Sequence, residues 1–350
     1  MPSNSTCIIA AAGSRKTTFL VEEALRCTEP VLITTYTLEN VDQLTSYFVE
    51  RCGQVPNHVT ILPWFTFLLR ECARPYQSFL VDIGYIRSIN FFDQAAIARQ
   101  NVPKNNVTGR YFDSAQNAVS RYLSDFICQV NTKSGGLLIR RLERIVGHVF
   151  VDEVQDLAGY DLDFLELLLT SSIRVIAVGD PRQATFMTSR AGKNKQFRRD
   201  GISDWFETQK QRGNCTLEVK NDCYRSVQSI CDFADALFPE LPPTRSVVEP
   251  AERHCGIFEI TTEMVDDYMA THKPVILRYS RATDTLGHKA INIGVSKGKS
   301  FDHVLIFPTG PMKKHLRSSG SFNGDRSKFY IAVTRARFSV CFVGDVARQL

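Results

Sequence analysis

Small residues followed by a lysine lie near the N-terminus in the pattern of a phosphate-binding loop: Ala10, Ala11, Ala12, Gly13, Ser14, Arg15, Lys16, Thr17 and Thr18. Small residues let backbone N–H groups point at an anion, and the N-terminus of a helix attracts negative charge. The pattern predicts a nucleotide site in which Lys16 contacts the β- and γ-phosphates and the Thr17 hydroxyl binds Mg²⁺. An ordinary strand–helix turn is the alternative, because Arg15 stands where a glycine normally precedes the lysine.

Two adjacent carboxylates follow the apolar run at the start of VFVDEVQD (149–156). At the end of a strand, Asp152 can hold Mg²⁺ through water, while Glu153 can polarise an attacking water. A capped helix start is the structural alternative. It would explain Asp156, but it leaves the other acids beside an apolar strand unexplained, so we favour a catalytic role.

A third polar segment, AVGDPRQATF (177–186), also ends an apolar run. Asp180 and Gln183 would lie beside the phosphates if this strand neighbours the strand that precedes Asp152. Taken alone, the segment has the composition of a simple turn.

Apolar runs alternate with helix-like segments along the chain, which is typical of parallel sheets covered by helices on both faces. The first set has expected strands at 7–12, 31–37, 59–63, 148–156 and 174–180, with helices over 16–27, 39–52 and 161–169. After Pro75 the pattern loosens, so we expect a small, mainly helical insertion at about 76–146, with two helices before residue 147. The second set has expected strands at 217–221, 257–261, 274–280, 303–309 and 339–345, with helices from Ser226 and over 326–337.

These patterns predict an α/β protein with two lobes, residues 1–212 and 213–350. The polar and basic stretch 188–213 is the best candidate for a linker. Two open α/β lobes would hold a ligand between them, at the carboxyl ends of the strands.

Composition sets broad limits on the function. The 350 residues carry a net charge of +5, which permits a polyanionic partner without requiring one. No run of 18 apolar residues is present and the N-terminal segment lacks the features of a signal peptide, so neither a membrane span nor secretion is expected. The ten cysteines form no CxxC pair, which indicates reduced cysteines of a cytoplasmic protein rather than a zinc site.

The motifs occur in an informative order: AAAGSRKTT (10–18), TTYT (34–37), VDEVQD (151–156), GDPRQ (179–183), NDCYRS (221–226), VSKGKSFDHVLIFP (295–308) and YIAVTRAR (330–337). This order resembles superfamily 1 helicases of the UvrD/Rep type over nearly the whole chain. The resemblance implies two RecA-like P-loop NTPase lobes, ATP held between them, and single-stranded nucleic acid bound across both lobes.

The resemblance also implies residue roles. In the first lobe, Lys16 and Thr17 match the phosphate-loop lysine and the Mg²⁺-bound hydroxyl. Asp152 matches the metal-binding acid, Glu153 the catalytic base and Gln183 the glutamine that senses the γ-phosphate.

In the second lobe, Tyr224 matches an aromatic side chain that stacks on the nucleotide base, and Arg225 matches a γ-phosphate contact. Arg335 matches the arginine finger. Phosphoryl transfer depends mostly on electrostatic positioning, and a finger arginine contributes several orders of magnitude to the rate.

Aromatic side chains beside the motifs are candidates for stacking on nucleic-acid bases: Tyr36, Trp64, Phe65 and Phe186. Most aromatic residues of a globular chain belong to the core, which is the alternative for each of them. The basic run Arg190, Lys193, Lys195, Arg198 and Arg199 could follow a phosphate backbone, although an exposed charged loop is the simpler interpretation.

The chain departs from the family pattern in three further places. The segment before Ala10 is too short for the family's adenine-reading glutamine motif, so we expect weak selectivity among NTPs. Ser300 occupies the place of a glutamate. The segment between Ser226 and Lys297 is too short for the large subdomain inserted in the second lobe of the family, so we expect little unwinding of duplexes.

Our leading interpretation is an ATP- and Mg²⁺-dependent motor on single-stranded nucleic acid, with DNA favoured over RNA. The alternative is a nucleotide-dependent sensor or accessory subunit that binds nucleic-acid ends and regulates a partner nuclease, as in phage defence. A small-molecule kinase is disfavoured, because it would leave AVTRAR and NDCYRS without a role.

Overall fold

The computed structural model describes residues 4–92, 94, 98–103, 105–250, 254–317 and 322–349. The N-terminal segment, which by its sequence lacks the features of a signal peptide, has its first three residues outside this set. The chain divides into two compact units. Unit 1 comprises Met1–Ile9, Lys16–Pro181 and Phe186–Val219, and unit 2 comprises Ala10–Arg15, Arg182–Thr185 and Lys220–Leu350.

Unit 1 contains a six-stranded sheet with the order β3-β2-β6-β7-β1-β8. The strands are β1 (Thr6–Ala10), β2 (Val31–Thr35), β3 (Val59–Pro63), β6 (His148–Val151), β7 (Arg174–Gly179) and β8 (Thr216–Lys220). The pairs from β3 through to β1 are parallel. Every residue of β2 is buried, as expected for a central strand of a sheet covered on both faces.

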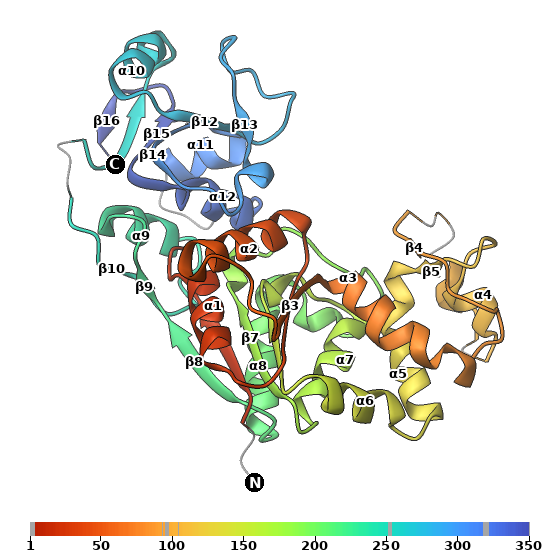
Figure 1. Ribbon diagram of the computed structural model, residues 1–350. Helices are drawn as coiled ribbons and strands as arrows, with labels where there is room; N and C mark the ends of the chain where they lie inside the picture. The colour runs from red at the N-terminus through yellow and green to blue at the C-terminus, as the bar shows by residue number, and fades with distance from the viewer. Residues whose placement is uncertain are drawn as a thin grey trace. The chain divides into compact units, whose positions relative to one another are not determined.

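The helices of unit 1 follow these strands (Figure 1): α1 (Lys16–Arg26), α2 (Leu38–Cys52), α3 (Trp64–Phe67), α7 (Tyr160–Leu169) and α8 (Ile202–Gln211). Local sequence sets the ends of α2. The Thr37 side chain accepts a hydrogen bond from the Asn40 backbone N–H at 3.2 Å, and Gly53 ends the helix with a φ of +79°. The turn before α2 therefore holds Tyr36 in a defined place after β2.

The insertion at about 76–146 has few regular elements before its two predicted helices. The structure has the short elements η2 (Arg74–Phe79), β4 (Ile89–Asn90), η3 (Ala98–Asn101), α4 (Val107–Tyr111), β5 (Ala118–Val119) and η4 (Ser120–Tyr122), followed by α5 (Leu123–Lys133) and α6 (Leu137–Ile145). The predicted helices are confirmed as α5 and α6. Phe126 of α5 and Leu138 of α6 share one hydrophobic cluster with Val149 of β6, so these helices are part of the core of unit 1.

Two sequence assignments within 188–221 are wrong. The expected second-lobe strand 217–221 is β8 at the edge of the first sheet, where the Thr216 N–H donates to the Ser5 carbonyl at 2.9 Å. The expected linker contains α8, whose Trp205 and Phe206 are buried in the core of unit 1. Residues up to Val219 therefore belong with the first sheet, and the boundary expected at 213 is too early.

Unit 2 contains a second six-stranded sheet with the order β13-β12-β14-β15-β11-β16, and a two-stranded pair of β9 and β10. The strands are β9 (Asp222–Cys223), β10 (Arg245–Ser246), β11 (Gly256–Ile260), β12 (Val275–Arg278), β13 (Ile291–Asn292), β14 (Phe301–Phe307), β15 (Ala336–Val343) and β16 (Arg348–Gln349). The pairs of the larger sheet are parallel except that of β11 with β16. Both units are therefore α/β with parallel sheets, as predicted.

The helices of unit 2 are α9 (Gln228–Asp235), α10 (Val265–His272), α11 (Gly310–Arg317) and α12 (Arg326–Val333). Helix α12 is capped by Asp325, whose side chain accepts from the Lys328 N–H at 3.0 Å, and the Phe329–Val333 portion of the helix is buried. The helix stops just before β15, which places Arg335 in the tight connection between them. Within the described residues, no helix has the length and apolar character needed to cross a membrane.

Candidate functional site

The predicted phosphate loop connects β1 to α1 and turns at Gly13. This glycine has a φ of +77°, and a Cβ placed on it would lie 2.7 Å from the Cys223 Sγ and 2.9 Å from the Arg225 Cβ. No larger residue fits without displacing these neighbours. The side-chain oxygen of Ser14 is buried and has no hydrogen-bond partner among the described residues. An unpaired buried hydroxyl in a loop of this composition fits a site that receives an external polar group.

Lys16 is the first residue of α1, followed by Thr17 and Thr18, so all three lie in the first turn of the helix. None of the three side chains is fully buried. Their place at a helix N-terminus is the one predicted from sequence, and an eleven-residue helix supplies the dipole that favours an anion there.

The predicted acids lie at one edge of the first sheet. Asp152 follows β6 and is 5% exposed, and its N–H donates to the Thr34 carbonyl of the neighbouring strand at 2.9 Å. The Glu153 N–H donates to Asp152 Oδ1 at 2.9 Å, and Glu153 adopts a left-handed backbone conformation with a φ of +54°. This conformation is uncommon for a non-glycine residue and is often found where a site constrains the chain.

Gln155 connects this acidic edge to the next strand. Its side-chain amide nitrogen donates to Glu153 Oε2, and its Oε1 accepts from the Asp180 N–H at 3.0 Å. β7 neighbours β6, which meets the condition set for Asp180 to lie at the same sheet edge as Asp152, and Asp180 is fully buried after β7. Sequence reasoning gave Gln155 no role of its own; its position between two acids in VDEVQD was the available signal.

In unit 2, Gln183 lies against Arg335. Arg335 is 1% exposed, and its Nη2 donates to Gln183 Oε1 at 3.3 Å. Its other nitrogens donate to the Ile331 and Lys299 carbonyl oxygens, each at 3.2 Å. The structure thus brings together two residues that sequence reasoning assigned to γ-phosphate sensing and charge stabilisation.

Tyr224 and Arg225 pack along the phosphate loop. The Tyr224 N–H donates to the Gly13 carbonyl at 2.9 Å, and Arg225 Nη1 donates to the Thr334 carbonyl at 3.1 Å. The Arg15 guanidinium lies 4.0 Å from the centroid of the exposed Tyr224 ring. The Arg15 side chain, which replaces the expected glycine, is therefore directed at this aromatic ring, as in a cation–π contact.

Burial distinguishes the four predicted stacking aromatics. Trp64 is 1% exposed and donates through Nε1 to Asp161 at 3.1 Å, so the expectation that it offers a face to bases does not hold in this structure. The rings of Phe65 and Phe186 lie 6.2 and 6.1 Å from that of Tyr36. Phe186 is 40% exposed. Burial and the nearby Asp156 raise the pKa of Tyr36, so its hydroxyl is neutral.

Comparison with known proteins matches residues 140–344 to the viral superfamily 1 RNA helicase core domain. The chain belongs to this family. The matched segment of the helicase core holds Asp152, Glu153, Gln183, Arg225 and Arg335. The superfamily expected from the motif order is confirmed, and the match does not specify the UvrD/Rep type.

Solved helicase structures are also similar to this chain. The arterivirus nonstructural protein 10 (helicase) is 15% identical with a TM-score of 0.49, covering 97% of this chain and 59% of its own. Its complex with DNA gives 15% identity and a TM-score of 0.49, with coverage of 97% and 60%. The PRRSV helicase gives 16% identity and a TM-score of 0.45, with coverage of 97% and 52%. The chain spans less than two thirds of these helicases, and no curated protein matches it.

Proposed function

We propose that this helicase core is an NTPase that single-stranded nucleic acid stimulates, and that it uses ATP and Mg²⁺ to move along the strand. One observation carries the proposal. The turn at Gly13 leaves no room for a side chain, and the adjacent Ser14 hydroxyl is buried without a partner among the described residues. Gly13 packs against Cys223 and Arg225, so only a residue without a side chain fits this turn, and a tight turn of small residues before a helix N-terminus supports phosphate binding.

The residues of unit 1 would bind the nucleotide and its divalent ion and activate the attacking water. Lys16 would neutralise charge on the β- and γ-phosphates, while Thr17 and Asp152 would hold the divalent ion, which lowers the charge that an attacking water meets. Glu153 would accept a proton from that water. Its hydrogen bond from Gln155 orients the carboxylate, so the base is already positioned before substrate arrives.

The residues of unit 2 would respond to the γ-phosphate. Arg335 donates a hydrogen bond to Gln183 in this structure, and Arg225 donates one to the Thr334 carbonyl. Transfer of the Arg335 and Arg225 guanidinium groups from protein oxygens to phosphate oxygens would stabilise charge in the transition state. Tyr224 would stack on the base, and Tyr36, Phe65 and Phe186 would stack on the bases of the strand.

The test is the rate of NTP hydrolysis by the full chain, with and without single-stranded DNA or RNA, for each of the four NTPs. We expect hydrolysis that a single strand stimulates and that Lys16→Ala abolishes. Equal rates with and without nucleic acid would contradict the motor. Hydrolysis retained in a folded Lys16→Ala variant would contradict the phosphate-loop assignment.

A second role, as an accessory subunit, gains support from the short segment between Ser226 and Lys297. Its helices and strands belong to unit 2 itself, and within the part of the chain that the structure describes it forms no separate subdomain. We propose that a partner protein, such as a nuclease, supplies the missing surface. None of the ten cysteines, all of which lie among the described residues, forms a disulfide, and this supports our proposal of a reducing, cytoplasmic setting for both roles.

A further inference from the structure

Two cysteine thiols of unit 2 are in contact with one another. Cys223 belongs to β9 and Cys231 to α9, and the Cys231 thiol donates a hydrogen bond to the Cys223 sulfur. Both sulfurs also contact the backbone of Ser226. Its N–H donates to Cys223 Sγ at 3.3 Å, and its carbonyl accepts from Cys231 Sγ at 3.8 Å. The reduced chain therefore holds these two thiols within reach of each other.

Cys223 also packs against the phosphate loop, whose segment Ala10–Arg15 belongs to the same unit. A Cβ placed on Gly13 would lie 2.7 Å from Cys223 Sγ, so the sulfur fills the space beside this turn. The next residue, Tyr224, donates its N–H to the Gly13 carbonyl at 2.9 Å, and Arg225 follows it. A change at the Cys223 sulfur therefore acts on the loop and on two residues that we propose to contact the nucleotide.

The surroundings of Cys223 favour its thiolate. The hydrogen bond from the Cys231 thiol has the largest effect, and the N–H groups of Ser226 and Arg225 and the Arg225 guanidinium act in the same direction. Together they lower the pKa of Cys223, although burial opposes them. The same thiol–thiol bond and burial raise the pKa of Cys231, which keeps its proton. Because thiolates react with oxidants much faster than thiols do, Cys223 is the nucleophile of the pair.

We propose that Cys223 and Cys231 are a modification site, at which a peroxide forms a reversible disulfide that switches off NTP hydrolysis. The inference rests on the proposed function and adds a regulation of the same site. In a reducing compartment, the disulfides that form are usually transient and redox-sensing, which fits such a switch.

The reaction has two steps. The Cys223 thiolate attacks one peroxide oxygen, the O–O bond breaks, and the other oxygen leaves as hydroxide, so that Cys223 becomes a sulfenic acid. The hydroxide takes the proton of the Cys231 thiol and becomes water. The Cys231 sulfur then attacks the Cys223 sulfur, the S–S bond forms, and the S–O bond breaks with loss of hydroxide. The two sulfurs together lose two electrons, and the peroxide accepts them.

Burial limits which oxidants reach the pair. Cys223 is 2% exposed and Cys231 is 4% exposed, whereas the adjacent Tyr224 is 43% exposed. The pair therefore lies just beneath the surface, where local opening of the chain admits a small molecule. Hydrogen peroxide is small enough to enter in this way. Oxidised glutathione is much larger, so we expect it to react far more slowly.

The disulfide would alter the support of the phosphate loop. The covalent bond draws the Cys223 sulfur toward Cys231, and it removes the thiolate that accepts the Ser226 N–H. The packing at Gly13 changes, and the backbone that carries Tyr224 and Arg225 becomes fixed to α9. We expect hydrolysis to fall about tenfold or more, because a small misplacement of groups that contact the reacting phosphate slows the reaction by such factors.

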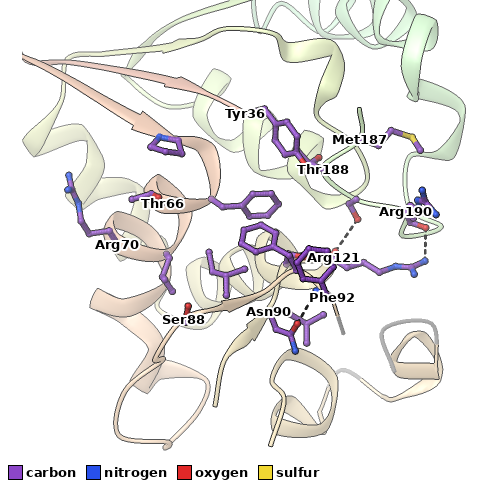
Figure 2. A pocket seen from close by; sticks show the side chains of 18 of the residues that line it. Tyr36, Thr66, Arg70, Ser88, Asn90, Phe92, Arg121, Met187, Thr188 and Arg190 are labelled. Carbon is purple, nitrogen blue, oxygen red and sulfur yellow. Dashed lines mark hydrogen bonds between the residues drawn. The ribbon is translucent and has the colours of Figure 1, made fainter. Parts of the chain in front are cut away.

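Single-strand binding provides an internal control. The residues that we propose for stacking on the strand lie in unit 1, where Tyr36 and Phe65 line a cavity of about 1130 Å³ (Figure 2). None of the described residues that line this cavity is a cysteine. Formation of the disulfide should therefore leave the binding of a labelled single strand, measured without nucleotide, unchanged.

The test treats the reduced full chain with hydrogen peroxide. The rate of stimulated NTP hydrolysis is measured before treatment, after it, and after addition of dithiothreitol. We expect a loss of about tenfold or more that the reductant reverses. Mass spectrometry of the digested chain should show the peptides of Cys223 and Cys231 joined. A loss without the joined peptide, or one that the reductant does not reverse, would contradict the switch.

Serine variants separate the two thiols, and each rate is compared with that of the same variant before oxidation. Cys223→Ser should keep its rate in peroxide. Cys231→Ser should form a sulfenic acid that dimedone labels, and no joined peptide. Cys52→Ser removes an exposed cysteine of α2 and is the matched control, which should respond like the unchanged chain. Thermal melting shows whether the variants fold; if one does not, the joined peptide of the unchanged chain still decides.

The outcomes distinguish the two proposals. If the joined peptide forms and the rate of hydrolysis does not change, the switch is wrong and the function stands. If the reduced chain hydrolyses no NTP with any single strand, the proposed function is wrong, and its regulation with it. If Cys223→Ser loses activity in peroxide as the unchanged chain does, or if single-strand binding falls together with hydrolysis, the loss comes from other damage and the pair is not a switch.

Discussion

The Arg15 guanidinium stacks 4.0 Å from the centroid of the Tyr224 ring. The stack joins a residue of the phosphate loop to the aromatic residue proposed to hold the nucleotide base. Arg15 adopts a φ of +59°, which is unfavourable for a residue with a side chain. The loop therefore directs this side chain away from its own interior, and one face of the Tyr224 ring is covered.

We expect Arg15→Ala to lower the KM for ATP by about two- to fivefold, because an exposed cation–π contact of about 0.5–1 kcal/mol no longer competes with base stacking. Tyr224→Ala should raise KM in the same assay. Steady-state kinetics over a range of ATP concentrations measures both effects. An increase in KM for Arg15→Ala would instead mean that the guanidinium binds the nucleotide.

Replacement of the proposed base should separate binding from hydrolysis. We expect Glu153→Gln to bind nucleotide with unchanged affinity and to lose about 10²- to 10⁴-fold in kcat, because only proton acceptance is removed. Equilibrium binding of a fluorescent nucleotide and a single-turnover assay check the two halves. Gln155→Ala is the companion variant. It keeps the carboxylate and removes its hydrogen-bond donor, so it should reduce kcat by less than Glu153→Gln.

Stimulated hydrolysis should be sensitive to any substitution of the buried Arg335. Arg335→Lys keeps the charge but cannot reproduce the hydrogen bonds to Gln183, Ile331 and Lys299 together. We expect both Arg335→Lys and Arg335→Ala to lose roughly 10³-fold or more in stimulated hydrolysis. Gln183→Ala should lose less. A kcat for Arg335→Lys within a few-fold of the unchanged chain would rule out a finger role.

Unit 2 should lose stability in mild acid because of His254. Burial and the nearby His272 and His303 lower the pKa of His254 to about 4 from an unfolded value of about 6.5. The unfolded chain therefore takes up a proton first as the pH falls. Stability is complete above about pH 6.5 and decreases between there and pH 4.

The expected loss is on the order of 1 kcal/mol, below the full linkage value, because the imidazole is partly exposed to solvent. Urea unfolding at several pH values measures it. His254→Gln keeps a polar side chain that does not titrate, so its stability should depend less on pH over this range. Identical pH profiles for both proteins would contradict the assignment to His254.

The helicase core alone should displace strands poorly. Hydrolysis and single-strand binding depend on residues that are present, whereas the segment between Ser226 and Lys297 forms no separate subdomain within the described chain. A strand-displacement assay at saturating single-strand binding and low salt is the measurement, since salt weakens phosphate contacts. Efficient unwinding of a long duplex by the monomer would show that this subdomain is not needed.

The sequence by itself determined which residues end the parallel strands. Asp152 and Asp180 each follow an apolar run, and the carboxyl ends of parallel strands meet at one edge of a sheet, so their proximity follows from the pattern. The loop before Lys16 was recognisable for a similar reason, because a strand–turn–helix with small residues has a local signature. The residue types of a short segment are therefore enough to predict the chemistry of that segment.

Only the tertiary structure decided which strands pair and which side chains contact one another. The alternation in 217–221 predicts a strand but cannot say which sheet it joins, because periodicity reports burial and not pairing. The stretch 188–213 is polar and basic overall, yet it contains Trp205 and Phe206 of α8, which are buried in the structure. Trp64 and Phe65 are adjacent aromatic residues that the sequence alone does not distinguish. In the structure, Trp64 donates to a buried carboxylate, whereas Phe65 borders a cavity. The contact of Gln183 with Arg335 joins residues far apart in the chain, and such contacts depend on how whole elements pack.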